Sequence, residues 1–315
     1  MTKNKVAIVG TGFVGMSYAY SLLNQGTIEE LILIDVNKDK AEGEAMDLNH
    51  GLAFAPRKMT IKAGDYSECK DAGLVVITAG VSQKPGETRI DLLNRNAKII
   101  QSVTRNIMDS GFDGIILVAS NPVDILTYVA WKESGLLSSK VLGSGTSLDT
   151  ARLRYEISKY IHIDSRNIHA YILGEHGDSE FVCWSKAYVG TKPMLDVIES
   201  MKEINFEDLD HIYIKVRDAA QEIIKRKNAT YYGIGMTLVR ITSAIFDNEN
   251  SIIPVSVYND GVYDIDKDMY IGLPAVLNRD GVHHVVNLKL SPEELEKLKK
   301  SASILKNSLN QMDIR

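Results

Sequence analysis

The sequence is poor in cysteine. Its 315 residues include only two, Cys69 and Cys183, and these lie far apart along the chain. Neither belongs to a Cys-x-x-Cys pair or to a Cys/His cluster, so the sequence indicates neither a disulfide framework nor a zinc site. We therefore expect a protein that uses no metal ion.

Long apolar runs are also missing. No run reaches the ~18 residues of a membrane-spanning helix. The apolar run that follows Lys5 is broken by Gly10 and is too short for a signal peptide. We therefore expect a cytoplasmic protein without a membrane partner.

Neither sign of charge dominates the composition. The 36 Lys and Arg residues and 41 Asp and Glu residues are interspersed and give a formal net charge of −5. This balance does not favour a nucleic-acid partner. The 44% apolar and 24% charged residues are typical of a soluble globular protein, and 315 residues suffice for one large domain or two ordinary ones.

A dinucleotide-binding fingerprint lies near the N-terminus. The apolar run 6–9 predicts a buried strand, the turn Gly-Thr-Gly-Phe-Val-Gly over 10–15 follows at once, and we expect a helix over 13–24. A second strand over 31–34 ends in Asp35. Its carboxylate can accept hydrogen bonds from ribose hydroxyls and would repel a 2′-phosphate, so it favours NAD over NADP. Without a cofactor, this stretch would be a glycine-rich turn between buried elements. The cofactor-binding residues predicted here are Gly10, Gly12, Phe13, Val14, Gly15 and Asp35.

Further buried strands are expected over 74–80, 115–119 and 141–143. In open α/β sheets, ligands gather at the carboxyl ends of the strands. This rule adds four candidate residues: Thr78, Ala79, Gly80 and Asn121. The polar loop 81–89 is either a mobile lid over the site or an ordinary solvated turn.

A histidine between two glycines, His176 in Gly-Glu-His-Gly-Asp, is the clearest indication of chemistry. The glycines leave room for a small molecule, and a histidine pKa of about 6.5 permits proton exchange near neutrality. A lone histidine is more often a solvated loop residue, so the interpretation depends on its partners. Asp149 and Arg152 share one face of a helix expected over 147–160, where they either serve one site or form a surface ion pair.

The second half of the chain has a different pattern. Helices are expected over 208–227 and 231–246, and β structure with turns over 252–288. A last helix begins after Ser291, which caps it. This half therefore predicts a mixed α+β arrangement.

Together these segments predict an α/β protein of two domains. A Rossmann, doubly wound parallel sheet over residues 1–143 would bind NAD, and an α+β substrate or catalytic domain over residues 144–315 would follow. Five motifs occur in one order: GTGFVG, AGVSQKPGETR, SNPVD, SLDTARLR and GEHGD. In these motifs the chain resembles the lactate/malate dehydrogenase family, and its bacterial L-lactate dehydrogenases in particular, over essentially its whole length. The resemblance implies reversible hydride transfer between NADH and pyruvate that gives (S)-lactate and NAD, the last step of homolactic fermentation.

The resemblance also implies roles for single residues. His176 would donate and accept the proton, with Asp149 as its partner, and Arg152 would bind the substrate carboxylate. Arg89 would polarise the substrate carbonyl from the lid, and Asn121 would line the site between cofactor and substrate.

Gln83 bears on the choice of substrate. Malate-type members carry an arginine at this lid position, where it pairs with a second carboxylate. Gln83 is neutral, so the extra carboxylate of oxaloacetate would lose its water without gaining a partner, at a cost of several kcal/mol. Thr230 also matches the lactate-type pattern. Pyruvate is therefore the expected substrate.

Two further residues match a regulatory pattern. Arg154 and His169 stand where many bacterial lactate dehydrogenases bind fructose 1,6-bisphosphate across a subunit interface. Two cationic groups suit a phosphate, but two solvated surface residues would give the same pattern. The resemblance thus implies a homotetramer in which fructose 1,6-bisphosphate is a candidate activator.

Three alternative functions are disfavoured by particular features of the sequence. Malate dehydrogenase is disfavoured by Gln83. An NAD-dependent glycosidase would need a metal-ligand set and a longer chain, and neither is evident. A sensor that binds the cofactor without catalysis would not need His176, Asp149, Arg152 and Arg89 together.

Overall fold

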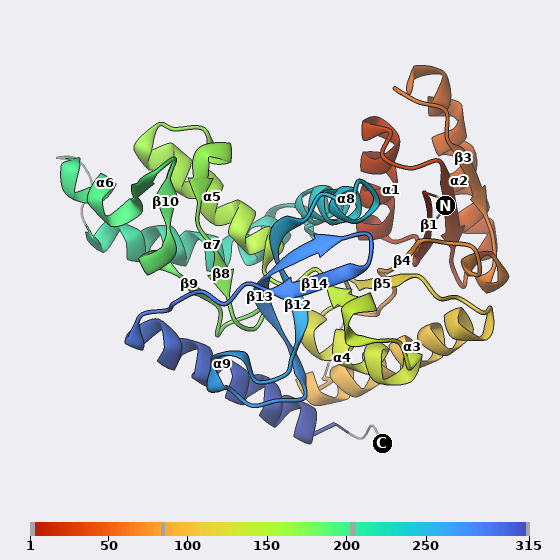
Figure 1. Ribbon diagram of the computed structural model, residues 1–315. Coiled ribbons are helices and arrows are strands. Elements are labelled where there is room, and N and C mark those ends of the chain that lie inside the picture. Colours follow the sequence, from red (N-terminus) through yellow and green to blue (C-terminus); the bar gives the residue numbers. More distant parts are fainter. Residues whose placement is uncertain (1–3, 83–85, 202–205, 313–315) are drawn as a thin grey trace.

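The computed structural model describes residues 4–82, 86–201 and 206–312 and is organised around a nine-stranded sheet (Figure 1). The strand order is β14-β13-β12-β6-β5-β4-β1-β2-β3. The parallel part consists of β1 (Lys5–Val9), β2 (Glu30–Ile34), β3 (Thr60–Ala63), β4 (Leu74–Ile77), β5 (Ile115–Val118) and β6 (Val141–Gly143). The strand order reverses at β1, which lies between β2 and β4. Open α/β sheets bind their ligands at such a switch point.

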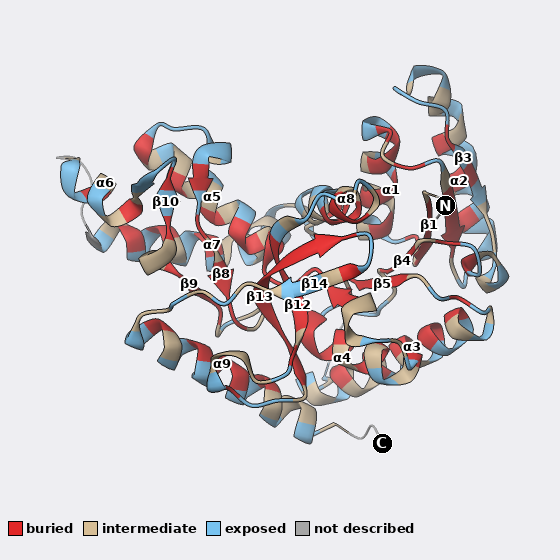
Figure 2. Ribbon diagram, viewed as in Figure 1, coloured by how far each residue is buried: buried red, intermediate tan, exposed pale blue. Residues whose placement is uncertain are grey.

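Helices cover both faces of this sheet, which explains why its central strands are apolar throughout. Every residue of β1 and β4 is buried, as Figure 2 shows by colour. In Figure 1, α1 and α8 lie above the sheet and α3 and α4 below it. Their bounds are α1 (Phe13–Gln25), α2 (Lys38–Gly51), α3 (Arg89–Asp109), α4 (Val123–Ser134) and α8 (Tyr232–Phe246). The predicted Rossmann fold is confirmed.

The strand β3 was not expected from the sequence. It is a four-residue edge strand, and of its side chains only that of Ile61 is buried. A strand with a single buried apolar residue has no continuous apolar run. This segment is therefore a strand because it pairs with β2, and its amino-acid composition alone does not indicate a strand.

The second half of the chain contributes three antiparallel strands to the same sheet. They are β12 (Ser251–Asn259), β13 (Met269–Asn278) and β14 (Gly281–Val285), and β12 joins β6 where Ser256 faces Gly143. A Cβ atom at Gly143 would lie 2.4 Å from Oγ1 of Thr127 and 2.9 Å from Cβ of Ser256, so only glycine permits this approach. The two halves thus share one sheet, which the expectation of a separate second domain did not include.

The rest of the second half surrounds a smaller core. Leu153 and Ile157 of α5 (Ser147–Ile161) pack with Ile212 and Val216 of α7 (Phe206–Lys227). Around them lie α6 (Met194–Ser200), β7 (Ile168–His169), β8 (Ile172–Leu173), β9 (Phe181–Val182), β10 (Tyr188–Val189) and β11 (Lys192–Pro193).

The last helix, α9 (Pro292–Asn310), begins as the sequence predicts. Ser291 accepts a hydrogen bond from the backbone N–H of Glu294, whose side chain in turn accepts from the backbone N–H of Ser291. Within the described ranges, no helix combines the length and apolar character needed to cross a membrane.

Candidate active site

The glycine-rich turn lies at the switch point, between the end of β1 and the start of α1. Gly10 has a φ of +106°, and a Cβ there would lie 2.8 Å from the backbone nitrogen of Ala79. A Cβ at Gly15 would lie 2.1 Å from the carbonyl oxygen of Gly10. Around Gly12, by contrast, no atom lies within 4 Å of the Cβ position. The turn thus leaves open space at a helix N-terminus, where backbone N–H groups attract a pyrophosphate.

Asp35, at the end of β2, fixes this turn. Its Oδ2 accepts hydrogen bonds from the backbone nitrogen of Thr11 at 2.7 Å and from Thr11 Oγ1 at 2.9 Å. Partial burial would raise the pKa of Asp35, but its hydrogen bonds from Asn37 and Thr11 outweigh this effect and lower it. Asp35 is therefore an anion beside the open space, as recognition of ribose hydroxyls requires.

The other predicted cofactor residues lie along the same edge. Thr78 donates a hydrogen bond to the carbonyl oxygen of Gly10 at 2.7 Å, and Gly80 lies beside Asn96 and Ser120. Phe13 is 70% exposed, and its ring stacks on that of Tyr231 with centroids 5.2 Å apart. An aromatic pair thus joins α1 to the residue that precedes α8.

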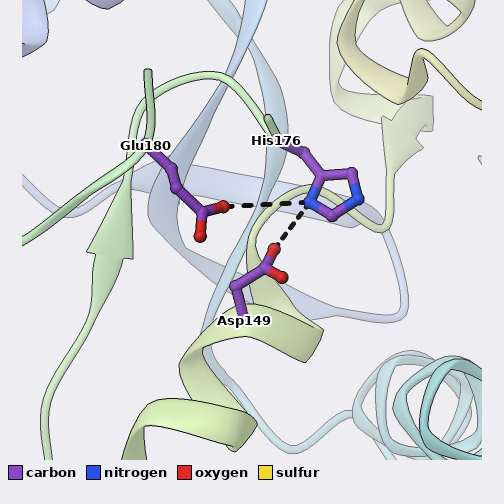
Figure 3. Close-up of side chains that lie close together, drawn as sticks. All are labelled: Asp149, His176 and Glu180. Carbon is purple, nitrogen blue, oxygen red and sulfur yellow. Dashed lines mark hydrogen bonds and ion pairs between the residues drawn. The ribbon is translucent and has the colours of Figure 1, made fainter. Parts of the chain in front are cut away.

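His176 and Asp149 form a close pair (Figure 3). Asp149 lies in the first turn of α5, and His176 lies in the loop between β8 and β9. Nδ1 of His176 is 2.6 Å from Oδ2 of Asp149, and Nη1 of Arg152 donates to Oδ1 of Asp149 at 2.9 Å. The side chain of Asp149 is only 3% exposed and that of Arg152 14%, so the alternative of a surface ion pair does not hold.

This arrangement controls the proton on His176. Burial alone would lower the pKa of His176, but the charge and hydrogen bond of Asp149 outweigh burial and raise the pKa to about 9. Burial would raise the pKa of Asp149, but the charges of His176 and Arg152 lower it. At neutral pH the imidazole is thus charged, and Figure 3 shows its other nitrogen, Nε2, turned away from both carboxyl groups.

The structure also places two acidic residues beside His176 that the sequence reasoning missed. Asp124, buried in the first turn of α4, accepts a hydrogen bond from the backbone N–H of His176 at 2.8 Å and one from Ser256 at 2.5 Å. Asp124 therefore holds the histidine loop against the sheet. Glu180 lies 4.0 Å from Nδ1 of His176. The available sequence signals were weak, since Asp124 is simply the last residue of the SNPVD motif and Glu180 precedes an apolar stretch.

His176 opens onto a cleft of about 1140 Å³. Arg89, the first residue of α3, and Asn121, at the end of β5, border the same cleft. Thr88 caps α3 in a reciprocal arrangement with Asp91, which places Arg89 at the rim. Lys297, Lys300 and Ile304 of α9 also border this cleft.

Three of the predicted substrate residues are not placed at the border of this cleft. Arg152, whose guanidinium contacts Asp149, and Thr230, between α7 and α8, are absent from that border as far as the described residues show. Gln83 lies outside the described residues. Their contacts with a substrate stay predictions.

The two candidate regulatory residues lie on adjoining elements. Nε of Arg154, on α5, donates to the carbonyl oxygen of Ala170 at 3.3 Å, and the guanidinium lies 5.5 Å from the centre of the Tyr171 ring. Partial burial lowers the pKa of Arg154. His169, next to Ala170, is exposed on β7.

Comparison with known proteins agrees with this geometry. Residues 4–143 match the family model of the lactate/malate dehydrogenase NAD-binding domain, and residues 146–313 match that of the lactate/malate dehydrogenase α/β C-terminal domain. An L-lactate dehydrogenase 2 of Bacillus cereus is 56% identical over 306 residues, which cover 97% of both chains.

Solved structures give the same result. A lactate dehydrogenase from a Medee basin deep-sea metagenome library is 74% identical, with a TM-score of 0.99 over 100% of both chains. The minor L-lactate dehydrogenase of Enterococcus mundtii in its ligand-bound form is 50% identical, with a TM-score of 0.97 over 100% of both chains. The chain therefore belongs to the lactate/malate dehydrogenase family of NAD-dependent oxidoreductases, among its L-lactate dehydrogenases.

Proposed function

We propose that the chain reversibly reduces pyruvate to L-lactate with NADH, through His176, Asp149, Arg152 and Arg89. The observation that carries this proposal is the buried contact of His176 and Arg152 with one carboxylate, that of Asp149, beside a cleft bordered by Arg89. Residues 1–143 would hold the cofactor, and residues 144–315 would supply the proton and the substrate-binding arginine.

The glycine-rich turn fits the cofactor. The N–H groups of Phe13 and Val14 at the start of α1 would bind its pyrophosphate, and Asp35 would bind its ribose hydroxyls. When bound, NADH supplies the hydride that pyruvate reduction needs. The protein's own part is to orient both partners and to supply the proton.

The charges at the cleft and beside His176 suit a 2-oxo acid. Arg152 can bind a carboxylate through two parallel hydrogen bonds, which the point charge of lysine cannot reproduce. Protonated His176 would give its Nε2 proton to the carbonyl oxygen as the hydride reaches the carbonyl carbon. Asp149 stabilises the charged imidazole before transfer, and Arg89 would stabilise the negative charge that develops on the oxygen. In the direction of lactate oxidation, neutral His176 would take the hydroxyl proton.

The neutral Gln83 supports pyruvate over oxaloacetate. Malate dehydrogenase remains the second candidate because it shares the family, and the sequence feature against it is this glutamine. Thr230 would complete a substrate wall that accepts a methyl group.

The proposed function also has a regulatory and a cellular part. We propose a cytoplasmic homotetramer that acts in glycolysis and fermentation and is activated by fructose 1,6-bisphosphate at Arg154 and His169. Support comes from the adjoining positions of these two residues, since Arg154 contacts Ala170, the neighbour of His169. A phosphate would then compete with the carbonyl oxygen of Ala170 for the guanidinium of Arg154.

The raised pKa of His176 predicts the pH dependence of both directions. Pyruvate reduction needs charged His176, so kcat/KM for pyruvate should stay level through neutral pH and fall as the pH rises through about 9. Lactate oxidation needs the neutral ring and should rise over the same interval. Initial rates from pH 6 to 10, followed by NADH absorbance, test this. A fall in pyruvate reduction already centred below pH 7 would contradict the role of Asp149 in raising this pKa.

A further inference from the structure

A second carboxyl group, that of Glu180, lies beside the His176–Asp149 pair and has no role in the mechanism above (Figure 3). Its Oε2 is 4.0 Å from Nδ1 of His176, and its side chain is 4% exposed. A carboxyl oxygen of Glu180 also lies within 4.8 Å of a carboxyl oxygen of Asp149, whose side chain is 3% exposed. Two buried carboxylates this close repel each other, so one of the two acids retains a proton. The acid that retains the proton can donate it in a hydrogen bond to the other.

The surroundings decide which acid carries this proton. Asp149 already accepts hydrogen bonds from His176 and Arg152, which favour its charged form. Glu180 has no such pair of cationic donors among the described contacts, and burial beside Asp149 raises its pKa to about 9. The proton therefore belongs on Glu180.

The groups around Glu180 leave this assignment unchanged. On α5 it faces Asp149 and Arg152, and in its own loop it faces His176. From α7, the Tyr213 hydroxyl donates to the backbone carbonyl oxygen of Glu180, which anchors this residue without compensating a charge on its side chain. Among the described residues, His176 and Arg152 are the cations that favour ionisation of Glu180, and the hydrogen bond of Arg152 goes to Asp149 instead.

We propose that Glu180 is a positioning residue for proton transfer, because it presents a protonated carboxyl group to Asp149. This inference rests on the proposed function. As a third hydrogen-bond donor to Asp149, Glu180 reduces the stabilisation that this carboxylate gives to the imidazolium. The pKa of His176 is therefore lower than it would be beside Asp149 alone, and His176 is a better acid. An ionised Glu180 would do the opposite, since two anions would then retain the proton on His176. Asp149, His176 and Glu180 offer ligand atoms that lie within 4.8 Å of one another, as the residues of a metal site would. The proton on Glu180 explains this close approach.

Two substitutions separate this role from simple filling of space. Glu180→Gln keeps a donor towards Asp149 through its amide and cannot ionise. Glu180→Leu keeps much of the volume and removes the donor. We expect the alkaline limb of kcat/KM for pyruvate to stay within about 0.3 pH unit of wild type in E180Q and to move up by about 0.5 unit or more in E180L. Lactate oxidation by E180L near pH 7 should fall about threefold, because more His176 is charged.

A second measurement detects the proton directly. Infrared spectra at neutral pH should show a protonated carboxyl group in wild type that disappears in E180Q. The control is Glu296→Gln, which makes the same replacement at an exposed position of α9 and should change neither the pH profile nor this band. The infrared result stands even when E180L does not fold.

Three outcomes would overturn the proposal. Identical pH profiles for wild type, E180Q and E180L would make Glu180 a space-filling residue. A downward shift in E180Q would show that Glu180 acts as an anion, and an unchanged carboxyl band in E180Q would show that the proton lies elsewhere. Absence of pyruvate reduction by wild type would instead contradict the proposed function, and the infrared band would still test the protonation of Glu180.

Discussion

Replacement of His176 by asparagine should lower kcat with pyruvate by about 10²–10⁴-fold, which is the usual contribution of a positioned general acid. Asparagine is close to histidine in size, keeps a polar group beside Asp149 and lacks a proton that titrates near neutrality. The backbone N–H of residue 176 would still donate to Asp124, so the loop keeps its anchor. Steady-state rates with saturating NADH and pyruvate measure the loss.

The same variant should still bind NADH. The glycine-rich turn and Asp35 lie at the carboxyl ends of β1 and β2, and within the described residues neither forms a hydrogen bond with His176. We expect the dissociation constant for NADH, measured by fluorescence titration, to change by less than about threefold. Full turnover in H176N would contradict the assignment of His176 as the acid. Loss of NADH binding would mean that the variant is misfolded.

The second large effect concerns Arg152. Arg152→Lys keeps a cation beside Asp149 but removes the planar pair of donors that a carboxylate needs. Hydrogen bonds between charged groups contribute about 1.5–3 kcal/mol each, so we expect kcat/KM for pyruvate to fall about 100-fold or more, largely through a higher KM. Steady-state kinetics over a wide range of pyruvate concentration separate the two parameters.

A matched control is available on the surface. Arg105 on α3 pairs with Glu133, and its side chain is 65% exposed. Exposed pairs contribute under about 1 kcal/mol, so Arg105→Lys should leave the kinetics unchanged. An Arg152→Lys variant with wild-type KM for pyruvate would show that Arg152 serves only to neutralise Asp149.

The first half of the fold could be predicted from the sequence because its signals are local. Buried parallel strands such as β1 and β4 are continuous apolar runs, and the turn over 10–15 follows the strand directly. The edge strand β3 lacks such a run. The joining of β12 to β6 depends on the absence of a side chain at Gly143, which is a three-dimensional fit that no periodicity records.

The site was predictable only in part, for a similar reason. His176, Asp149 and Arg152 stand in recognisable motifs, and the structure brings them into contact. Asp124 accepts a hydrogen bond from the backbone of His176, which lies 52 residues further along the sequence. The proposed protonation of Glu180 depends on the buried carboxylate of Asp149 beside it. Contacts of this kind arise from packing between elements. They become visible once the loop between β8 and β9 is placed against α4 and α5.

The measurement that tests the central claim most directly is NADH oxidation with pyruvate and, separately, with oxaloacetate, each with and without fructose 1,6-bisphosphate. We predict a preference for pyruvate of about 100-fold or more in kcat/KM, since oxaloacetate would leave an unpaired carboxylate beside Gln83, and about 2.7 kcal/mol corresponds to that ratio. Activation by the bisphosphate, lost in Arg154→Gln, would support the regulatory site. A preference for oxaloacetate would contradict the proposed substrate, and absence of turnover with either acid would contradict the account as a whole.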